Sequence, residues 1–321
     1  MSAQPTAAVF NDRDLARRRD EARGLWLGLL GVAIFSMTLP MTRLAVGPAD
    51  DAQLPPLFVT AGRAALAGLL SLIYLRVIGA PRLKRAHLGA LLVSALGTVV
   101  GFPLFLSLAL RHVDAMHAAV VTGQKPLATA TVAALHFRQR PSAGFWVCAV
   151  LGCVLVLVFA ALEGGGTLTA ADGWLLLAVL SAAGGYVAGA KLATEWPAER
   201  VISWVLVLSL PLTAPLAWAW RPAGAVSAAA WGGLAYVTLF SMWLGFFAWY
   251  RGLALGGALR VSQVQLLQPF LALLFAVPVL GETLEPTTLA FALAVLGVVI
   301  VGKKMPVRHV APAAVMQEMR P

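Results

Sequence analysis

The chain has 321 residues, of which 60% are hydrophobic and 12% are charged, and its mean hydropathy is +0.83. Soluble globular domains contain about 25% charged residues, so this composition excludes a soluble domain and predicts an integral membrane protein. The net charge of +10 does not indicate nucleic-acid binding, because the Lys and Arg residues are scattered over short connections rather than gathered on one face.

Apolar stretches of about 20 residues follow one another along the chain, each long enough to cross a hydrocarbon core of about 30 Å. The links between them are short and contain Gly, Pro or charged residues, so none holds a soluble domain. The predicted fold class is an all-α membrane protein with ten transmembrane helices and terminal tails at 1–23 and 303–321. We expect the helices at 24–46, 56–78, 87–110, 115–136, 143–162, 173–193, 200–220, 227–249, 258–280 and 286–302.

The distribution of basic residues indicates how these helices are oriented. Lys and Arg concentrate in the two tails and in alternate links, as expected of cytoplasmic segments. Of the 24 Lys and Arg residues, only Arg43, Arg111 and Arg221 fall in the opposite links. Arg63 and Lys125 fall inside helices. We therefore predict cytoplasmic N- and C-termini and a multi-pass protein of the plasma membrane, such as a bacterial inner membrane.

Two segments of the chain resemble each other. Residues 115–139 align with residues 258–282 at an offset of 143, which matches Pro126 to Pro269. Ten helices in two copies leave five helices per copy, and an odd number inserts the second copy upside down. We expect two inverted five-helix repeats, and such repeats provide the two related conformations that alternating access requires. The expected repeats are 24–162 and 173–302.

Several features resemble a known family. They are Arg63 in the second helix, the run WYRGLALGGALRVSQVQLLQP at 249–269 and the Gly-Glu pair at 281–282. Together with the paired proline-centred helices, they make residues 24–302 similar to the EamA-type ten-helix carriers of the drug/metabolite transporter superfamily. The first copy departs from the family pattern, because Gln139 stands where the family has an acidic residue.

This resemblance implies a secondary active transporter that exports small polar metabolites, such as amino acids, by alternating access. The implied partners are a small-molecule substrate, the lipid bilayer and protons as the coupling ion, and a homodimer is left open. Within transport, the alternative is export of hydrophobic or cationic drugs. The alternative from a different class is an intramembrane enzyme acting on a lipid-linked substrate, with His112 and Asp114 as its closest candidate residues.

The fourth expected helix contains the most unusual residue of the sequence, Lys125. A charged side chain at the centre of a bilayer costs about 2.5–3.5 kcal/mol on insertion scales, so we expect it to face a cavity. Thr122, Gln124 and His117 lie on the same helix and are further candidates for substrate binding. The alternatives are a lysine held by backbone carbonyls and a histidine with only a structural role.

The second copy places Gln265 and Gln268 just before Pro269. We expect both glutamines to line the substrate path, with interhelical hydrogen bonds of about 0.6 kcal/mol each as the alternative. Proline frees backbone carbonyls and weakens a helix locally, so Pro126 and Pro269 are predicted hinges.

Four further residues complete the candidate site. Arg63 is expected to bind substrate or to tether a helix end through carbonyls. Tyr186 and Trp243 are expected in an aromatic cavity lining, with an interfacial belt as the alternative. Glu282 is expected to cap the N-terminus of the helix that follows it, where a carboxylate is favoured.

Motifs of soluble enzymes and of metal sites do not occur in the sequence. Residues 297–304, GVVIVGKK, nearly fit a phosphate-binding loop, but they lack its Ser or Thr and lie at the end of an apolar stretch. No HExxH motif, paired-cysteine metal spacing or nucleophile elbow is found. We therefore expect no catalytic residue, no metal and no cofactor.

Overall fold

The computed structural model describes residues 12–81, 83–136, 140–163, 167–193, 196–256, 262–305 and 307–308. These residues form a helical bundle with one short antiparallel pair of strands, β1 (Arg140–Pro141) and β2 (Val307–Arg308). The helices are α1 (Asp12–Ser36), α2 (Thr38–Val46), α3 (Pro56–Val77), α4 (Leu88–Ser94), α5 (Phe102–Ala109), α6 (Ala115–Thr122), α7 (Lys125–His136), α8 (Ala143–Glu163), α9 (Ala170–Ala193), α10 (Ala198–Ala219), α11 (Ala228–Tyr236), α12 (Gly245–Gly256), α14 (Gln268–Leu280) and α15 (Pro286–Lys304). Shorter turns complete them: the 3-10 helices η1 (Arg85–His87) and η4 (Ser262–Leu267), and the π-helices η2 (Ala95–Gly101) and η3 (Val237–Leu244).

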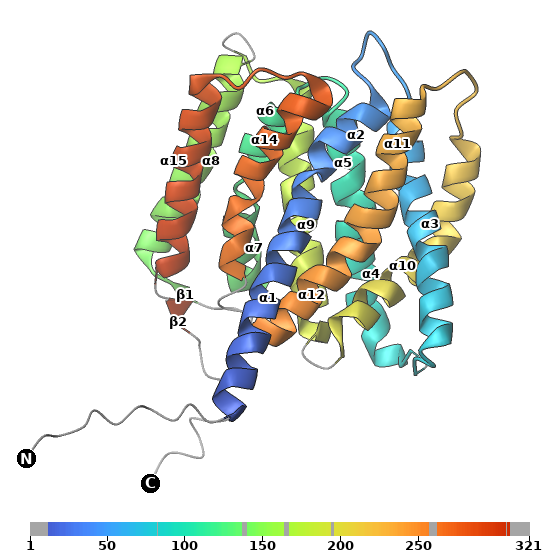
Figure 1. Ribbon diagram of the computed structural model, residues 1–321. Helices are drawn as coiled ribbons and strands as arrows, with labels where there is room; N and C mark the ends of the chain where they lie inside the picture. Colours follow the sequence, from blue (N-terminus) through green and yellow to red (C-terminus); the bar gives the residue numbers. More distant parts are fainter. Residues whose placement is uncertain are drawn as a thin grey trace, which may run out of the picture.

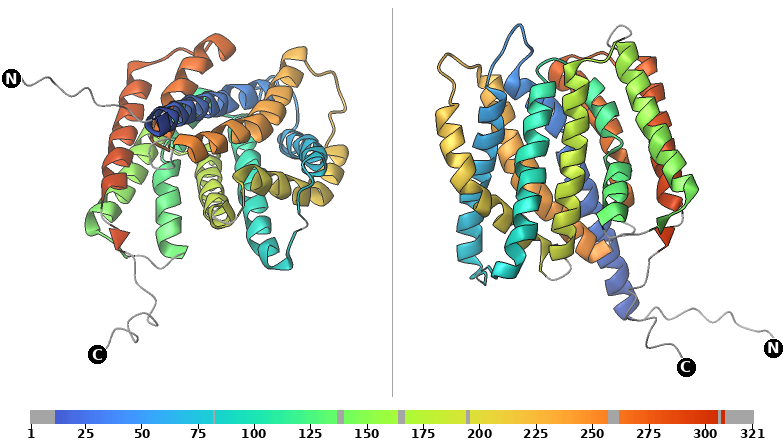
Figure 2. Two further views of the ribbon diagram at one scale, coloured as in Figure 1. Left: turned by 60° about the horizontal axis from the view of Figure 1, so that its bottom comes forward. Right: turned by 180° about the vertical axis from the view of Figure 1, so that it is seen from behind.

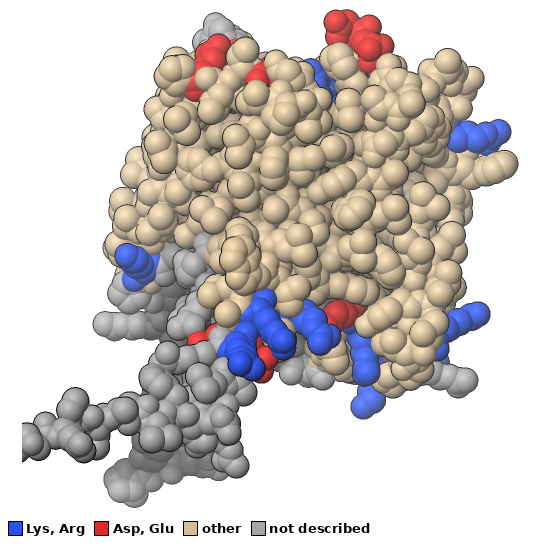
Figure 3. All heavy atoms as spheres, viewed as in Figure 1, with Lys and Arg blue, Asp and Glu red and all other residues tan. Residues whose placement is uncertain are grey.

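Long side chains on the outside of the bundle are apolar. Trp26, Leu66, Val147 and Leu293 are each more than half exposed, which is the arrangement expected of a surface that faces lipid. Figure 3 shows the same surface as a broad belt free of charge, with Lys and Arg mainly at one end and Asp and Glu mainly at the other. We call these the basic end and the acidic end.

Seven helical stretches of the described residues are long and apolar enough to cross a membrane. Two shorter apolar helices, Val264–Leu280 and Pro286–Gly302, follow them in the chain. The composition therefore predicted the helical class correctly, and the structure supports a multi-pass membrane protein.

Two pairs of helices form the flanks of the bundle. In Figures 1 and 2, α3 packs against α10 on one flank and α8 packs against α15 on the other, while α1, α9 and α12 lie between them. The end at which α1 begins and α15 finishes is the basic end. Because α1 contacts α12 and α4 contacts α9, the two halves of the chain interlock rather than pack as separate bodies.

Several of the expected helices are interrupted. The third and eighth each contain a π-helical turn, η2 and η3. Turn η2 ends at Gly101 of the Gly-Phe pair at 101–102, and η3 ends just before the Gly-Phe pair at 245–246. The fourth is divided between Thr122 and Lys125, so that α7 begins at Lys125. In the ninth, α14 likewise begins after a 3-10 turn.

The interruptions recur at the offset of the sequence repeat. Helix α7 begins at Lys125 and α14 begins at Gln268, 143 residues later. Pro126 and Pro269 thus lie in the first turn of a new helix, where the missing N–H leaves no hydrogen bond unmade. The helix expected at 115–136 is therefore not continuous. The helix expected at 258–280 is not continuous either, within the part of it that the structure describes. Residues 258–261 and Gln139 lie outside the described part of the chain.

Glycines bring two pairs of helices into close contact. A Cβ placed at Gly185 of α9 would lie 2.7 Å from Thr98 Cγ2 and 2.8 Å from Thr98 N, in η2. A Cβ at Gly252 of α12 would lie 2.7 Å from the backbone nitrogen of Gly28 in α1. These contacts leave no room for a methyl group, so small residues set the spacing of both pairs.

The close approach at Gly185 gives a direct test of the packing. We expect Gly185→Ala to destabilise the protein by about 1–3 kcal/mol, because the neighbouring backbone cannot move aside easily. Gly184→Ala is the matched control, since a Cβ at Gly184 meets no atom within 4 Å. Thermal unfolding of the purified protein in detergent would measure both, and equal melting temperatures for the two variants would contradict this packing.

Candidate functional site

A cavity of about 950 Å³ lies inside the bundle and is the candidate functional site. Its walls come from both halves of the chain. The lining includes eight residues expected at the site from the sequence, namely Arg63, Thr122, Lys125, Pro126, Tyr186, Gln265, Gln268 and Pro269. Three other expected residues, Gln124, His117 and Trp243, are not among the residues that line it.

Lys125 enters the cavity at the break between α6 and α7. Its Nζ atom lies 5.0 Å from the centroid of the Phe102 ring, within the range of a cation–π contact. Within the described part of the chain, no carboxylate forms a salt bridge with Lys125. The expectation of a cavity-facing lysine agrees with this geometry.

Gln124 turns away from the cavity, although it precedes Lys125 directly. Its side chain is buried and its Oε1 atom accepts a weak hydrogen bond from Cys153 Sγ at 3.7 Å. Because the helix is broken at this point, neighbouring residues do not follow the regular helical faces on which the sequence prediction relied. In this conformation Gln124 connects α7 to α8.

Arg63 is buried in the cavity wall, only 2% exposed. Its Nη2 atom donates a hydrogen bond to Ser241 Oγ at 3.2 Å, and Ser241 Oγ shares a second one of 2.8 Å with Thr38 Oγ1. Ser241 and Thr38 also line the cavity, and sequence reasoning missed both. In the sequence, Ser241 and Thr38 are hydroxyl residues within apolar stretches, and such residues are common in membrane helices. Nothing else in the sequence pointed to them.

His117 lies outside the cavity, at the acidic end of the bundle. Its Nε2 atom is 2.7 Å from Asp172 Oδ1, and its ring packs against Phe159. The Thr169 backbone N–H and hydroxyl both donate to Asp172 Oδ2 at 2.8 Å. Asp172 lies just before the helix expected at 173–193, so the sequence did not predict this contact between α6 and α9.

Trp243 also lies outside the cavity lining. Its indole ring packs at 5.1 Å from the ring of Phe247, and its Nε1 atom is buried. Tyr186, which was expected in an aromatic lining, and Phe246, which was not, both line the cavity, whereas Trp243 does not.

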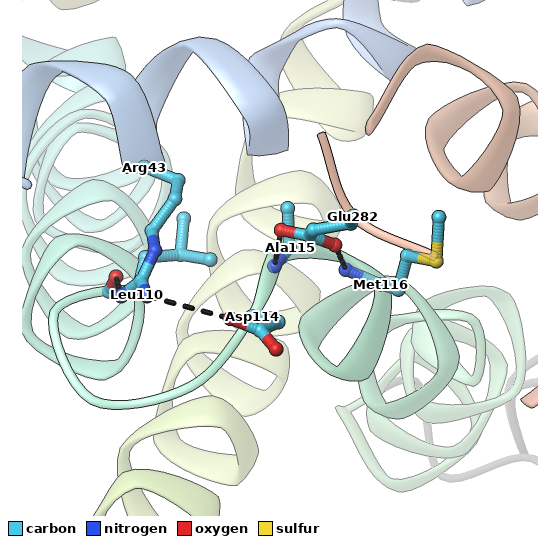
Figure 4. Close-up of polar contacts among 6 residues, drawn as sticks. All are labelled: Arg43, Leu110, Asp114, Ala115, Met116 and Glu282. Atoms are coloured by element: carbon cyan, nitrogen blue, oxygen red, sulfur yellow. Dashed lines mark hydrogen bonds and ion pairs between the residues drawn. The ribbon is translucent and has the colours of Figure 1, made fainter. Parts of the chain in front are cut away.

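The acidic end is held together by polar contacts between segments that are far apart in the sequence (Figure 4). Glu282 accepts hydrogen bonds of 2.8 Å from the backbone nitrogens of Ala115 and Met116, at the start of α6. Arg43 donates to the carbonyl of Leu110 and lies 3.4 Å from Asp114 Oδ1. Glu282 was expected to cap the helix that follows it, but both of its carboxylate oxygens are directed to α6.

The turn before Glu282 explains this placement. Gly281 has a φ angle of +71°, a left-handed conformation that ends α14 and redirects the chain. Burial raises the pKa of the Glu282 carboxyl above its ordinary range, and the two backbone donors and Arg43 oppose that rise. The positive end of the α6 dipole favours the charged form in the same way.

The cavity extends unequally toward the two ends. Its lining includes Trp196, Pro197 and Glu199, which lie at the link from α9 to α10 at the basic end. None of the six residues at the acidic end that Figure 4 labels is among the residues that line the cavity. Among the described residues, no group of three or more His, Cys, Asp or Glu side chains could hold a metal.

The contact of Glu282 with α6 can be tested by removing its charge. Glu282→Gln keeps the size of the side chain but removes its charge and one of its two accepting oxygens. The side chain can then no longer accept hydrogen bonds from both Ala115 N and Met116 N through separate oxygens. We expect a loss of about 1 kcal/mol in the free energy of unfolding, and a melting temperature lower by about 2–4 °C. Glu285→Gln is the control, because Glu285 is exposed and makes no side-chain cap at α15. Equal shifts in the two variants would contradict a specific cap.

Comparison with known proteins gives three findings. The model of the EamA-like transporter family matches residues 22–161 and again residues 169–302. The "Uncharacterized transporter YdeK" of Bacillus subtilis (strain 168) is 44% identical over 274 residues, which cover 84% of this chain and 94% of that protein. A solved structure described only as "Crystal structure of protein" is 18% identical, with a TM-score of 0.59, and the match covers 88% of this chain and 98% of that one. At that identity, the last match shows the fold alone.

Proposed function

The chain belongs to the EamA-like transporter family, and we propose that it is a secondary carrier that exports small polar metabolites, such as amino acids, by alternating access. The observation that carries this proposal is the internal cavity, which holds two cationic side chains and extends toward one end of the bundle. A carrier needs a polar site that is enclosed by the bundle and reached from one side at a time.

The proposed architecture is ten membrane passages in two inverted repeats. The family model matches the chain twice, which supports a duplication. The equivalent breaks at Lys125 and Gln268 and the paired π-helical turns η2 and η3 support it further. Thr98 and Ser241, which are 143 residues apart, both line the cavity from those turns. The proposed repeats are 24–162 and 173–302.

The proposed orientation places the basic end in the cytoplasm, because Lys and Arg are retained there during insertion. The cavity lining that reaches the link from α9 to α10 then supports a conformation open to the cytoplasm. The contacts of Glu282 and Arg43 would close the opposite side. A proton gradient across a plasma membrane is the proposed driving force.

A substitution of Lys125 tests this proposal most directly. Lys125 lines the cavity and makes no salt bridge with a described residue, so its loss should leave the fold intact. We expect Lys125→Gln to reduce solute export at least tenfold, on the order of the cost of losing one charged hydrogen bond. Cells that overproduce the protein or Lys125→Gln would be compared by mass spectrometry of the metabolites in their medium. Lys84→Gln is the control, because Lys84 is exposed at the basic end.

Two results would count against a carrier of polar metabolites. One is identical release of metabolites from cells with the wild-type protein and with Lys125→Gln. The other is chemical change of the released solute during counterflow in proteoliposomes, which would indicate an enzyme. Solute exchange without chemical change would support transport.

The break at Pro269 generates a second prediction. If the start of α14 moves during the exchange of conformations, Pro269→Ala should extend the helix and slow counterflow several-fold, with a smaller effect on binding. Pro278→Ala is the control, since Pro278 lies inside the same helix, away from the break. Equal losses of binding and exchange in Pro269→Ala would indicate a packing defect instead of a hinge.

A further inference from the structure

Arg63 differs from Arg43 and Arg111 in where its side chain lies. Arg111 donates to the carbonyls of Val46 and Leu54, and Arg43 reaches a carbonyl and a carboxylate. Each of those side chains holds a link or a helix end in place. Arg63 instead lies within α3, in the wall of the cavity, and its side chain donates to the hydroxyl of Ser241.

Two of the three nitrogen atoms of the Arg63 guanidinium, Nε and Nη1, are buried and have no hydrogen-bond partner among the residues that the structure describes. A guanidinium carries five N–H donors and stays charged, so leaving donors unmatched in an apolar interior is costly. Native proteins satisfy nearly all buried polar groups. Because Arg63 lines the cavity, an acceptor for these donors can reach them from inside it.

The hydroxyl groups beside Arg63 complete a donor surface. Ser241 Oγ accepts from Arg63, so its own proton is available to Thr38 Oγ1 at 2.8 Å. In that arrangement the Thr38 hydroxyl is one further donor at the cavity wall. The charge and the direction of these donors favour an anionic acceptor, and they disfavour a cationic group.

The rest of the cavity has the same electrostatic preference. Lys125 adds a second cation to the wall, from α7. Of the described residues that line the cavity, Glu199 is the only carboxylate, and it lies in the first turn of α10 at the basic end. No salt bridge between Glu199 and Arg63 occurs in the described part of the chain.

We propose that Arg63, held by Ser241 and Thr38, is the docking point for a carboxylate group of the transported solute. This inference rests on the proposed transport function and narrows its substrate class to small carboxylates. A carboxylate is the acceptor that forms the strongest hydrogen bonds with a guanidinium. Lys125 then contacts a different part of the solute or steers the anion into the cavity.

Binding of simple probes tests this docking point without any transport. The purified full-length protein in detergent would be titrated with acetate and benzoate, and with their uncharged analogues acetamide and benzamide, at constant ionic strength. Melting temperatures as a function of probe concentration give apparent Kd values. We expect the carboxylates to raise the melting temperature and the amides to leave it unchanged.

Variants then locate the effect. Arg63→Gln should weaken carboxylate binding at least tenfold, whereas Arg76→Gln, at the exposed end of the same helix, should not change it. Should Arg63→Gln fail to fold, Arg63→Lys keeps the charge but loses the planar donor geometry, and it should also bind carboxylates about tenfold more weakly.

Two results would overturn the proposal. They are equal effects of acetate and acetamide on the wild-type protein, and an unchanged apparent Kd in Arg63→Gln or Arg63→Lys. Because these measurements concern binding, they are independent of the metabolite-release experiment. A carrier that exports a solute but ignores carboxylates would retain the proposed function and lose this site.

Discussion

A cation inside an apolar bundle is the constraint on which the site depends. Each of Arg63 and Lys125 costs several kcal/mol in a bilayer unless the protein gives it a polar or aqueous surrounding. The bundle meets this requirement by interrupting its helices next to the charges, since α7 begins at Lys125 and the π-helical turn η3 supplies Ser241 to Arg63. The cavity, the helix breaks and the charged side chains are therefore one feature.

The proposed repeats share their backbone irregularities but differ in their side chains. Lys125 and Gln268 begin equivalent helices, and both side chains line the cavity, one charged and one neutral. Thr98 and Ser241 occupy equivalent turns, but Ser241 contacts Arg63 while Thr98 bonds to the carbonyl of Ser94. In the proposed architecture, the similar backbones of the two repeats provide two related conformations. The different side chains at equivalent positions make the two sides of the cavity differ in polarity. Selectivity in such an architecture resides where the equivalent residues differ.

The sequence predicted the helices well, because hydrophobic length and charge alternation both depend on the bilayer. The stretch expected at 56–78 is the helix Pro56–Val77, and the stretch expected at 143–162 is Ala143–Glu163. The breaks were not predictable in detail, since a π-helical turn has the same apolar composition as the helix around it. His117 does not line the cavity, and its partner Asp172 lies just before the helix expected at 173–193, so their contact was not predicted.

The acidic end imposes an energetic requirement on any change of conformation. Glu282 joins the end of α14 to the start of α6, so the two interrupted helices are connected by two hydrogen bonds of 2.8 Å. Opening that end would separate a carboxylate from a helix N-terminus and release the Arg43 contacts as well, at a cost of a few kcal/mol. A solute shifts such an equilibrium only by the difference between its affinities for the two states, and a shift from 1:99 to 99:1 needs about 5.5 kcal/mol. Charged contacts inside the cavity are strong enough to supply a difference of that size. Under the proposed alternating access, the polar groups at Arg63 and Lys125 and the contacts at Glu282 must therefore be balanced against one another so that both conformations are reached.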